Sequence, residues 1–304
     1  MTTPSSHTFA LTASQADVLE KRLRDGTYEL HDVPYARIGA RKPGLSITLY
    51  HKGPKVVVQG KECGEFVTYV LEPEILGEAR LGYEETLDPS QFEPHFGIDE
   101  SGKGDFFGPL VIAGVYTDAS IARALIAAGV TDSKRIGSDQ RIRQLAAAIL
   151  ATPGVLVEVV IIPPEKYNLL HTKMGNVNRL LAWGHARVIE NLLARQPDCP
   201  RSLSDQFAAN PRVLASALLE NGRKIQLDQR TKAESDVAVA AASILAREKF
   251  IDWLDKATIR LGQPLPRGAG PQVIQAGKAI LERHGSNTLT FIAKMHFRTA
   301  SELT

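Results

Sequence analysis

The sequence predicts an α/β domain whose mixed sheet is covered by helices on both faces, preceded by a small α+β unit. The large domain is predicted by strand-like and helical patterns that alternate after residue 93. These patterns begin with two apolar segments joined by a glycine-rich loop, which is typical of a β-hairpin. The small unit is predicted by an amphipathic helix followed by period-two strands. At 304 residues the chain is long enough to give each part its own core.

The composition is that of a soluble globular protein, with 43% hydrophobic and 23% charged residues. A net charge of +2 gives no overall basic field, so affinity for nucleic acid has to come from local clusters. The two cysteines, Cys63 and Cys199, show neither a disulfide framework nor metal-ligand spacing. The sequence contains no signal-peptide pattern and no membrane span of ~18 apolar residues. We therefore expect a cytoplasmic protein and, without a coiled-coil pattern, a monomer.

The N-terminal unit is predicted over residues 1–85. A helix begins near Ser14 and ends at Gly26, two strands cover residues 45–50 and 56–59, and a helix follows over residues 65–71. Between Val33 and Lys61 there are six basic residues and no acid: Arg37, Arg41, Lys42, Lys52, Lys55 and Lys61. They form either a solvated face with lysines at its edge or a surface that follows phosphates. Residues 86–93 are predicted to be a linker, so the large domain covers residues 94–304.

The large domain is predicted to begin with the hairpin and to continue through alternating helices and strands. The expected segments are a hairpin over 96–116, a helix ending at Gly129, a helix capped by Ser138, a buried strand over 155–162, a helix over 176–195, a weak strand over 199–204, an alanine-rich helix over 233–261, and two helices beginning at Pro271 and Ser286.

Acidic residues occur at several of these strand ends and helix starts. Asp99 and Glu100 end the first strand of the hairpin, beside the turn Gly102-Lys-Gly104, and Asp205 follows the weak strand. Glu234 opens the alanine-rich helix, with Asp236 two residues later. Carboxylates that meet at strand ends need a cation between them, and two magnesium ions about 4 Å apart suit displacement at phosphorus. Taken singly, Asp205 and Glu234 are more often a surface charge or a helix cap.

Several of these segments resemble the type 2 ribonucleases H. Phe96–Pro109 resembles the first motif of that group, Asp132-Ser-Lys134 the second, and Lys232–Ser235 with Val239–Arg247 the fourth. The match is to ribonuclease HIII rather than HII. It rests on Gly104-Asp-Phe-Phe-Gly-Pro109, Lys232-Ala-Glu234, Leu265–Gly270 and Lys294-Met-His-Phe297, and on residues 47–50 and 56–61, which resemble the TATA-binding-protein-like domain of HIII enzymes.

The resemblance implies a ribonuclease H-like fold and an endonuclease that hydrolyses the RNA strand of RNA–DNA hybrids. It implies two Mg²⁺ or Mn²⁺ ions and products with 5′-phosphate and 3′-hydroxyl ends. The metal-binding acids that it implies are Asp99, Glu100, Asp205 and Glu234, with Asp236 as the alternative fourth ligand. The implied substrate contacts are Ser101, Gly102, Lys103, Gly104 and Lys134, together with Arg41, Lys42, Lys52 and Lys55 of the N-terminal domain. Two alternatives are cleavage at single ribonucleotides in duplex DNA, as in HII, and a catalytically silent hybrid-binding protein.

Overall fold

The computed structural model describes residues 6–77, 89–131, 133, 136–231 and 233–303. Contacts divide the chain into two compact units, Met1–Pro89 and Ser90–Thr304. Of the predicted linker over residues 86–93, the first three residues lie outside the described residues, and Pro89–Phe92 form a short 3₁₀ segment. Each unit has its own hydrophobic core.

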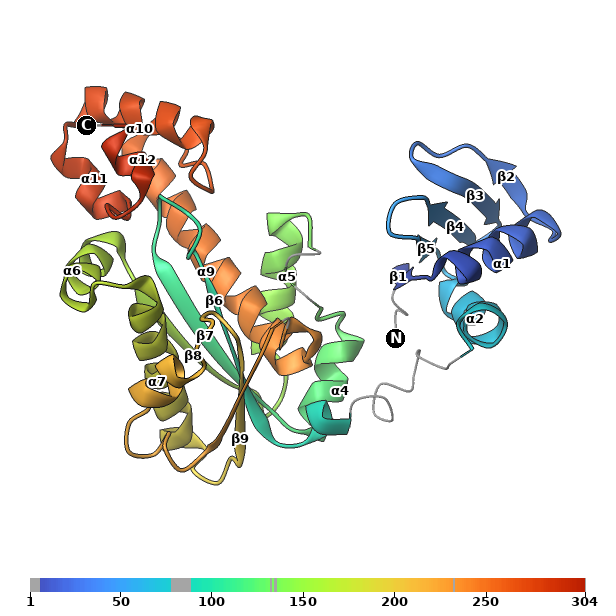
Figure 1. Cartoon of the computed structure of the whole chain (residues 1–304), viewed down its shortest axis with the longest axis horizontal. Helices are drawn as coiled ribbons and strands as arrows, with labels where there is room; N and C mark the ends of the chain where they lie inside the picture. Colours follow the sequence, from blue (N-terminus) through green and yellow to red (C-terminus); the bar gives the residue numbers. More distant parts are fainter. Residues whose placement is uncertain (1–5, 78–88, 132, 134–135, 232, 304) are drawn as a thin grey trace. The chain divides into compact units, whose positions relative to one another are not determined.

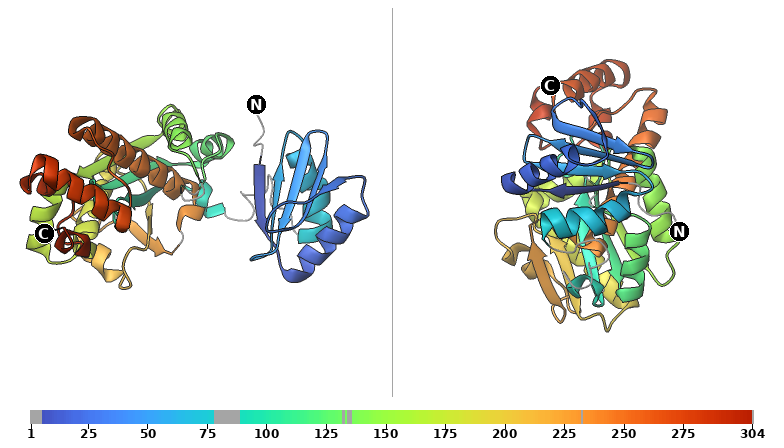
Figure 2. Two further views of the ribbon diagram at one scale, coloured as in Figure 1. Left: turned by 90° about the horizontal axis from the view of Figure 1, so that it is seen from above. Right: turned by 90° about the vertical axis from the view of Figure 1, so that its right-hand side faces the viewer.

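The N-terminal unit contains a five-stranded antiparallel sheet in the order β1-β5-β4-β3-β2. Figure 2 shows this sheet, in blue, with its helices. Its strands are β1 (Ser6–Ala10), β2 (Glu29–His31), β3 (Ala36–Lys42), β4 (Leu45–Tyr50) and β5 (Lys55–Gln59). Its helices are α1 (Ala13–Arg24), α2 (Cys63–Phe66) and the π-helical segment η1 (Val67–Leu76).

One face of this sheet is covered by helices. In β4 the alternating residues Leu45, Ile47 and Leu49 are buried, and they share a core with residues of α1 and η1. The predicted helix over residues 65–71 is instead the short α2 followed by η1. Pro73 lies inside η1 and has no N–H to donate, so a regular α-helical ladder cannot continue through it.

The second unit contains a five-stranded mixed sheet in the order β10-β9-β6-β7-β8. Its strands are β6 (His95–Ser101), β7 (Leu110–Thr117), β8 (Leu156–Ile162), β9 (Arg201–Asp205) and β10 (Gln226–Arg230). The predicted hairpin is confirmed, because β6 and β7 pair antiparallel, as do β7 and β8. The strands β9 and β10 run parallel to each other, and β9 runs parallel to β6. The expected α/β class with a mixed sheet is therefore confirmed.

Helices cover both faces of this sheet (Figure 1). They are α4 (Ala119–Ala127), α5 (Asp139–Leu150), α6 (Pro164–Met174), α7 (Val177–Arg195), α8 (Arg212–Ala217), α9 (Val237–Leu261), α10 (Pro271–His284), α11 (Asn287–Ile292) and α12 (Arg298–Ser301), with the 3₁₀ segments η2 (Pro89–Phe92) and η4 (Ala233–Ser235). On one face α9, α4 and α5 pack on Val111, Ala113 and Val115 of β7. On the other face α6 and α7 pack on Leu110 and Ile112.

Glycines let the two long helices lie close to the sheet. A Cβ atom on Gly97 of β6 would lie 2.2 Å from the main-chain carbon of Ala238, at the start of α9. A Cβ atom on Gly114 of β7 would lie 2.4 Å from the side chain of Val188 on α7. The absence of side chains at these positions therefore sets the distance between the sheet and its covering helices.

The start of α9 differs from the prediction. The helix begins at Val237 and not near residue 233, because Asp236 caps it by accepting hydrogen bonds from the amides of Ala238 and Val239. Glu234 consequently lies in η4, a separate 3₁₀ turn before the helix.

The contact at Gly97 makes a testable prediction about stability. Replacing Gly97 with Ala places a Cβ atom against the backbone of α9, which has no flexible side chain to yield, so we expect the free energy of unfolding to fall by about 3 kcal/mol. Chemical denaturation followed by circular dichroism measures the change. Gly137→Ala is the matched control, since a Cβ atom there meets nothing within 4 Å. Equal stability of the two variants would contradict the close packing of β6 and α9.

Candidate active site

Two parallel strands bring three of the predicted carboxylates to one edge of the sheet. Asp99 and Glu100 lie near the end of β6, and Asp205 is the last residue of β9. Ile98 of β6 is paired with Ser204 of β9, so Asp99 and Asp205 follow at equivalent positions on neighbouring strands. The pleat of β6 points Asp99 and Glu100 to opposite faces of the sheet. Each therefore meets a different helix.

Asp99 faces α9 and is almost completely buried, with 8% of its surface exposed. Its carboxylate interacts with the hydroxyl of Ser243 and accepts a hydrogen bond from the amide of Glu100 at 2.8 Å. Burial, followed by the nearby charge of Glu100, raises the pKa of Asp99 to about 8, although those two hydrogen bonds lower it. Without a cation, the ionised form of Asp99 is therefore unfavourable in this site.

Glu100 faces α7, where it meets His185. The Nε2 atom of His185 lies 3.1 Å from Oε2 of Glu100, and its Nδ1 atom lies 2.9 Å from Oγ of Ser204. Lys103 approaches Glu100 from the turn, with Nζ 3.9 Å from Oε1. Sequence reasoning missed His185, because a histidine within the apolar stripe of α7 carries no signal of its own.

Asp205 connects the sheet to η4. Its Oδ1 atom accepts a hydrogen bond from the amide of Ala233 at 3.1 Å, which holds the 3₁₀ turn that carries Glu234 beside the end of β9. Asp236 is placed differently. It is fully buried, caps α9, and both of its oxygens lie 3.1 Å from Nε2 of His95. Its carboxylate therefore has structural partners within the interior.

The glycine-rich turn closes one side of the site. Gly102 has a φ of +88°, and a Cβ atom there would lie 2.2 Å from the carbonyl oxygen of Pro109, so only glycine fits. Lys103 donates from Nζ to the carbonyl oxygen of Phe207 at 3.1 Å. Together with the acids, the turn lines a pocket of about 290 Å³. The lining residues are Asp99, Glu100, Ser101, Gly102, Lys103, Gly104, Ser133, Asp205, Ser243 and Arg247.

The predicted second motif is described only at Ser133, since Asp132 and Lys134 lie outside the described residues. The hydroxyl of Ser133 lies 2.8 Å from that of Ser243, and its carbonyl oxygen accepts a hydrogen bond from Nη1 of Arg247 at 2.5 Å. Ser243 and Arg247 belong to the fourth motif. Their presence in that motif is a sequence signal for the site, although neither was predicted as a site residue.

The predicted basic surface of the N-terminal unit is partly neutralised. Ion pairs join Arg41 to Glu29 at 2.6 Å and Lys42 to Glu62 at 3.5 Å. Arg37 is likewise paired, with Asp17 and Glu20 of α1. By contrast, Lys52 and Lys55 are exposed and have no acidic partner among the described residues, and Lys55 lies over the ring of Tyr50. Charge counted along one segment therefore overstates the free positive charge.

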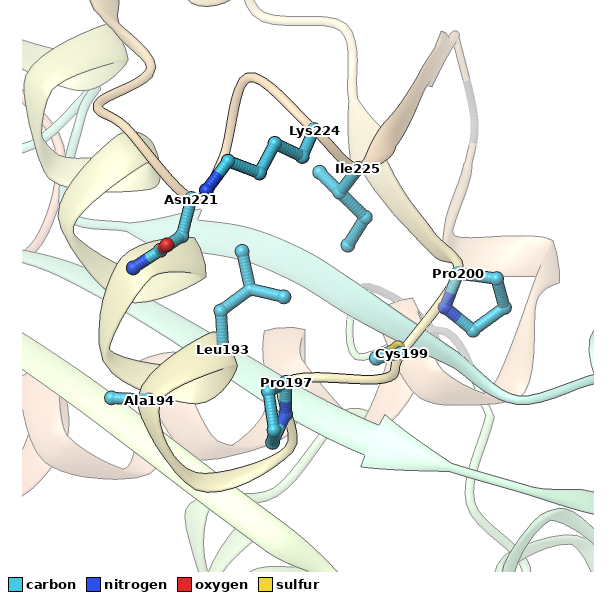
Figure 3. Close-up of a pocket in the computed structure, with 8 residues that line it drawn as sticks. All are labelled: Leu193, Ala194, Pro197, Cys199, Pro200, Asn221, Lys224 and Ile225. Carbon is cyan, nitrogen blue, oxygen red and sulfur yellow. The ribbon is translucent and has the colours of Figure 1, made fainter.

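A larger pocket, of about 450 Å³, lies at the other end of β9, between the end of α7 and the start of β10. Figure 3 shows Leu193 and Ile225 pointing into it. Its lining includes Pro197, Pro200 and Lys224 but no carboxylate. Size alone therefore does not identify the site; the carboxylates do.

The described residues contain neither a preformed metal cluster nor a membrane-spanning helix. No three of their histidine, cysteine, aspartate or glutamate side chains converge on a common point as metal ligands do. Asp99, Glu100 and Asp205 nevertheless line one pocket. Over the described ranges, no helix is both long and apolar enough to cross a membrane.

Comparisons with known proteins agree on one family. The family described as ribonuclease HII matches residues 96–300. Ribonuclease HIII of Protochlamydia amoebophila is 45% identical over 284 residues, which is 93% of this chain and 92% of that protein. Ribonuclease HIII of Chlamydia abortus is 42% identical over 304 residues, 100% of this chain and 98% of that protein.

Solved structures are similar over the same range. The crystal structure of Bst ribonuclease HIII in complex with Mn²⁺ is 28% identical and has a TM-score of 0.66, covering 98% of both chains. Ribonuclease HII of Archaeoglobus fulgidus, in its complex with PCNA, is 27% identical and has a TM-score of 0.57. That match covers 69% of this chain and 96% of that one.

The raised pKa of Asp99 predicts how stability changes with pH in the metal-free protein. Between the ordinary value of 3.8 and about 8, the folded state keeps a proton on Asp99 that the unfolded state has lost, so the free energy of unfolding falls as pH rises. Asp99→Asn removes this dependence. We expect the variant to be more stable than the native chain at pH 8, by a margin that shrinks toward pH 5. Urea denaturation with chelator at both pH values measures it.

The control for this prediction is Asp255→Asn, since Asp255 is an exposed residue of α9 that pairs with Arg143. It should give no gain at pH 8. If Asp99→Asn changes the free energy of unfolding by the same amount at pH 5 and pH 8, the raised pKa of Asp99 is contradicted.

Proposed function

Because this chain belongs to the ribonuclease HIII family, we propose that the carboxylates at the ends of β6 and β9 hold divalent metal ions against the RNA strand of its substrate. The comparisons confirm the predicted resemblance to this family and the expectation that the chain is an enzyme. The chain is a ribonuclease H, an endonuclease that acts on RNA–DNA hybrids. What we propose is which residues perform the reaction.

The observation that carries the assignment is the shared pocket of Asp99, Glu100 and Asp205 beside the glycine turn. An oxygen-rich donor set of this kind suits Mg²⁺ or Mn²⁺. The raised pKa of Asp99, which burial and then the charge of Glu100 cause, indicates negative charge that a cation would compensate. Two such ions, when bound, would supply the activation of water and the charge stabilisation needed for displacement at phosphorus, leaving 5′-phosphate and 3′-hydroxyl ends.

Glu234 is the fourth ligand that we propose, in preference to Asp236. Glu234 lies in η4, which Asp205 holds beside the site, whereas Asp236 is committed to capping α9 and to His95. Removing Asp236 from these partners would leave His95 and the helix start uncompensated. The two acids thus have separate roles, one in chemistry and one in stability.

The turn Ser101–Gly104 is proposed to read the RNA strand. The turn lines the pocket, and main-chain amides of such a turn can be offered to ribose 2′-hydroxyls, which are the groups that distinguish RNA from DNA. Lys103 would lie near the phosphates, and so would Lys134, whose placement is outside the described residues. We propose the N-terminal unit, residues 1–85, as the domain that binds the hybrid, with Lys52 and Lys55 as contacts. Action as a cytoplasmic monomer with residues 86–93 as linker remains a prediction.

The division between Glu234 and Asp236 is testable with two variants. Glu234→Gln should lower kcat on an RNA–DNA hybrid at least about 100-fold, because a metal ligand is lost, while leaving the melting temperature unchanged. Asp236→Ala should leave kcat within a few-fold but lower the free energy of unfolding by about 2–5 kcal/mol, because both the helix cap and the partner of buried His95 are lost. Steady-state cleavage and thermal unfolding of both variants provide the measurement.

The reverse pattern, with cleavage lost in Asp236→Ala and retained in Glu234→Gln, would assign the fourth ligand to Asp236. If both variants keep full cleavage activity, neither Glu234 nor Asp236 is a fourth metal ligand. The native chain assayed on duplex DNA with one embedded ribonucleotide is the substrate control: exclusive cutting there would contradict the hybrid as substrate.

The role of the N-terminal lysines is testable through salt dependence. Each phosphate contact contributes about 0.9 to the slope of log K against log salt concentration, so Lys52→Ala with Lys55→Ala should reduce that slope by about 2. Fluorescence anisotropy of a labelled hybrid, without divalent metal, measures binding. Arg41→Ala with Lys42→Ala is the matched control and should change the slope less, because both residues are paired with acids. Equal changes would show that the ion pairs do not decide which cations bind.

A further inference from the structure

His185 lies between the two strands that carry the proposed ligands. It is fully buried on α7, the helix that covers the face to which Glu100 points. Its Nε2 atom is 3.1 Å from Glu100 on β6, and its Nδ1 atom is 2.9 Å from Ser204, the residue before Asp205 on β9. One ring thus joins β6 and β9 at the level where both present a carboxylate to the pocket.

The chemistry of the two contacts determines which nitrogen donates. An ionised carboxylate can only accept, so Nε2 carries the proton and donates to Oε2 of Glu100. Nδ1 faces a hydroxyl, which can either donate or accept. The ring of Phe207 packs against the imidazole with a centroid distance of 4.8 Å. Both nitrogens have polar partners and the ring contacts Phe207, so the imidazole has a fixed orientation.

This contact holds one oxygen of Glu100 and leaves the other toward the turn. Oε2 is bound by His185, whereas Oε1 lies 3.9 Å from Nζ of Lys103, a residue that lines the pocket. Rotation of the carboxylate would break the buried hydrogen bond to His185. Donors of this kind fix the orientation of metal-binding carboxylates and increase metal affinity.

We propose that His185 is a positioning residue that orients the Glu100 carboxylate for metal binding by donating from Nε2. The proposal rests on the proposed function, in which Glu100 is a metal ligand. His185 does not line the pocket and acts only through Glu100. A histidine that merely filled the core would contribute shape and burial, and the position of its donor would be unimportant.

Two amide variants separate donor position from shape. The amide nitrogen of Gln has the same number of bonds from Cβ as Nε2 of histidine, and that of Asn has the same number as Nδ1. His185→Gln therefore keeps a donor for Glu100, whereas His185→Asn keeps only the contact with Ser204. We expect His185→Asn to weaken Mn²⁺ binding about 10- to 100-fold and His185→Gln to stay within about threefold of the native chain.

Isothermal titration of the full chain with Mn²⁺, without nucleic acid, measures this affinity, and thermal unfolding of both variants reports their stability. Equal weakening in the two variants, or none in His185→Asn, would overturn the proposal. Glu100→Gln distinguishes the two levels of the argument. If it does not weaken Mn²⁺ binding, Glu100 is not a ligand and both proposals fail. If Glu100→Gln weakens Mn²⁺ binding but His185→Asn does not, Glu100 remains a ligand and only the proposed role of His185 fails.

A measurement on the native chain covers the case in which His185→Asn does not fold. Nitrogen-15 spectra of histidine-labelled protein, with the His185→Gln spectrum used to identify the signal, report which ring nitrogen of His185 is protonated. We expect protonated Nε2 both without metal and with Mg²⁺. An unprotonated Nε2 in either state would overturn the proposal.

Discussion

The site depends on two acids at successive positions of one strand. Because side chains alternate along β6, Asp99 is directed to the face covered by α9 and Glu100 to the face covered by α7. Ser243 of α9 then contacts the first carboxylate and His185 of α7 the second. This arrangement requires both helices to lie close to the sheet, which Gly97 and Gly114 permit. A residue with a side chain at either glycine would move a helix and, with it, a partner of one carboxylate.

Parallel pairing of β6 with β9 completes the group of acids, and the buried acids lower the stability of the metal-free fold. The pairing places Asp205 beside Asp99 at the same sheet edge, and burial together with the charge of Glu100 raises the pKa of Asp99 to about 8. Without a cation the folded chain is therefore electrostatically unfavourable at this edge. In the proposed function, the same unfavourable charge would increase the affinity for a divalent ion, so stability without metal and metal binding would oppose each other at these residues.

Sequence predicted the parts of the fold that carry strong periodicity or local turn signals. The hairpin around Gly102, the apolar strand β8 and the long helices α7 and α9 all have such patterns. Sequence did not predict β10, whose residues Gln-Leu-Asp-Gln-Arg are polar and become a strand only through pairing with β9. The site acids were placed from motifs. His185 was not, because its importance comes from a contact across 85 positions of the chain that no local pattern contains.

The charge of the N-terminal unit also depends on contacts between residues that are distant in the sequence. Six basic residues without an acid suggest a continuous cationic surface, but β2 and α1 bring Glu29, Asp17 and Glu20 onto two of the arginines. Among the described basic residues of this segment, Lys52, Lys55 and Lys61 are exposed and form no ion pair with an acid, so they can neutralise phosphates without first breaking one. Affinity for a polyanion is decided by such unpaired cations, since a paired one must lose its partner to release a counterion from the nucleic acid. Binding by this unit is therefore better inferred from Lys52 and Lys55 than from the total of its basic residues.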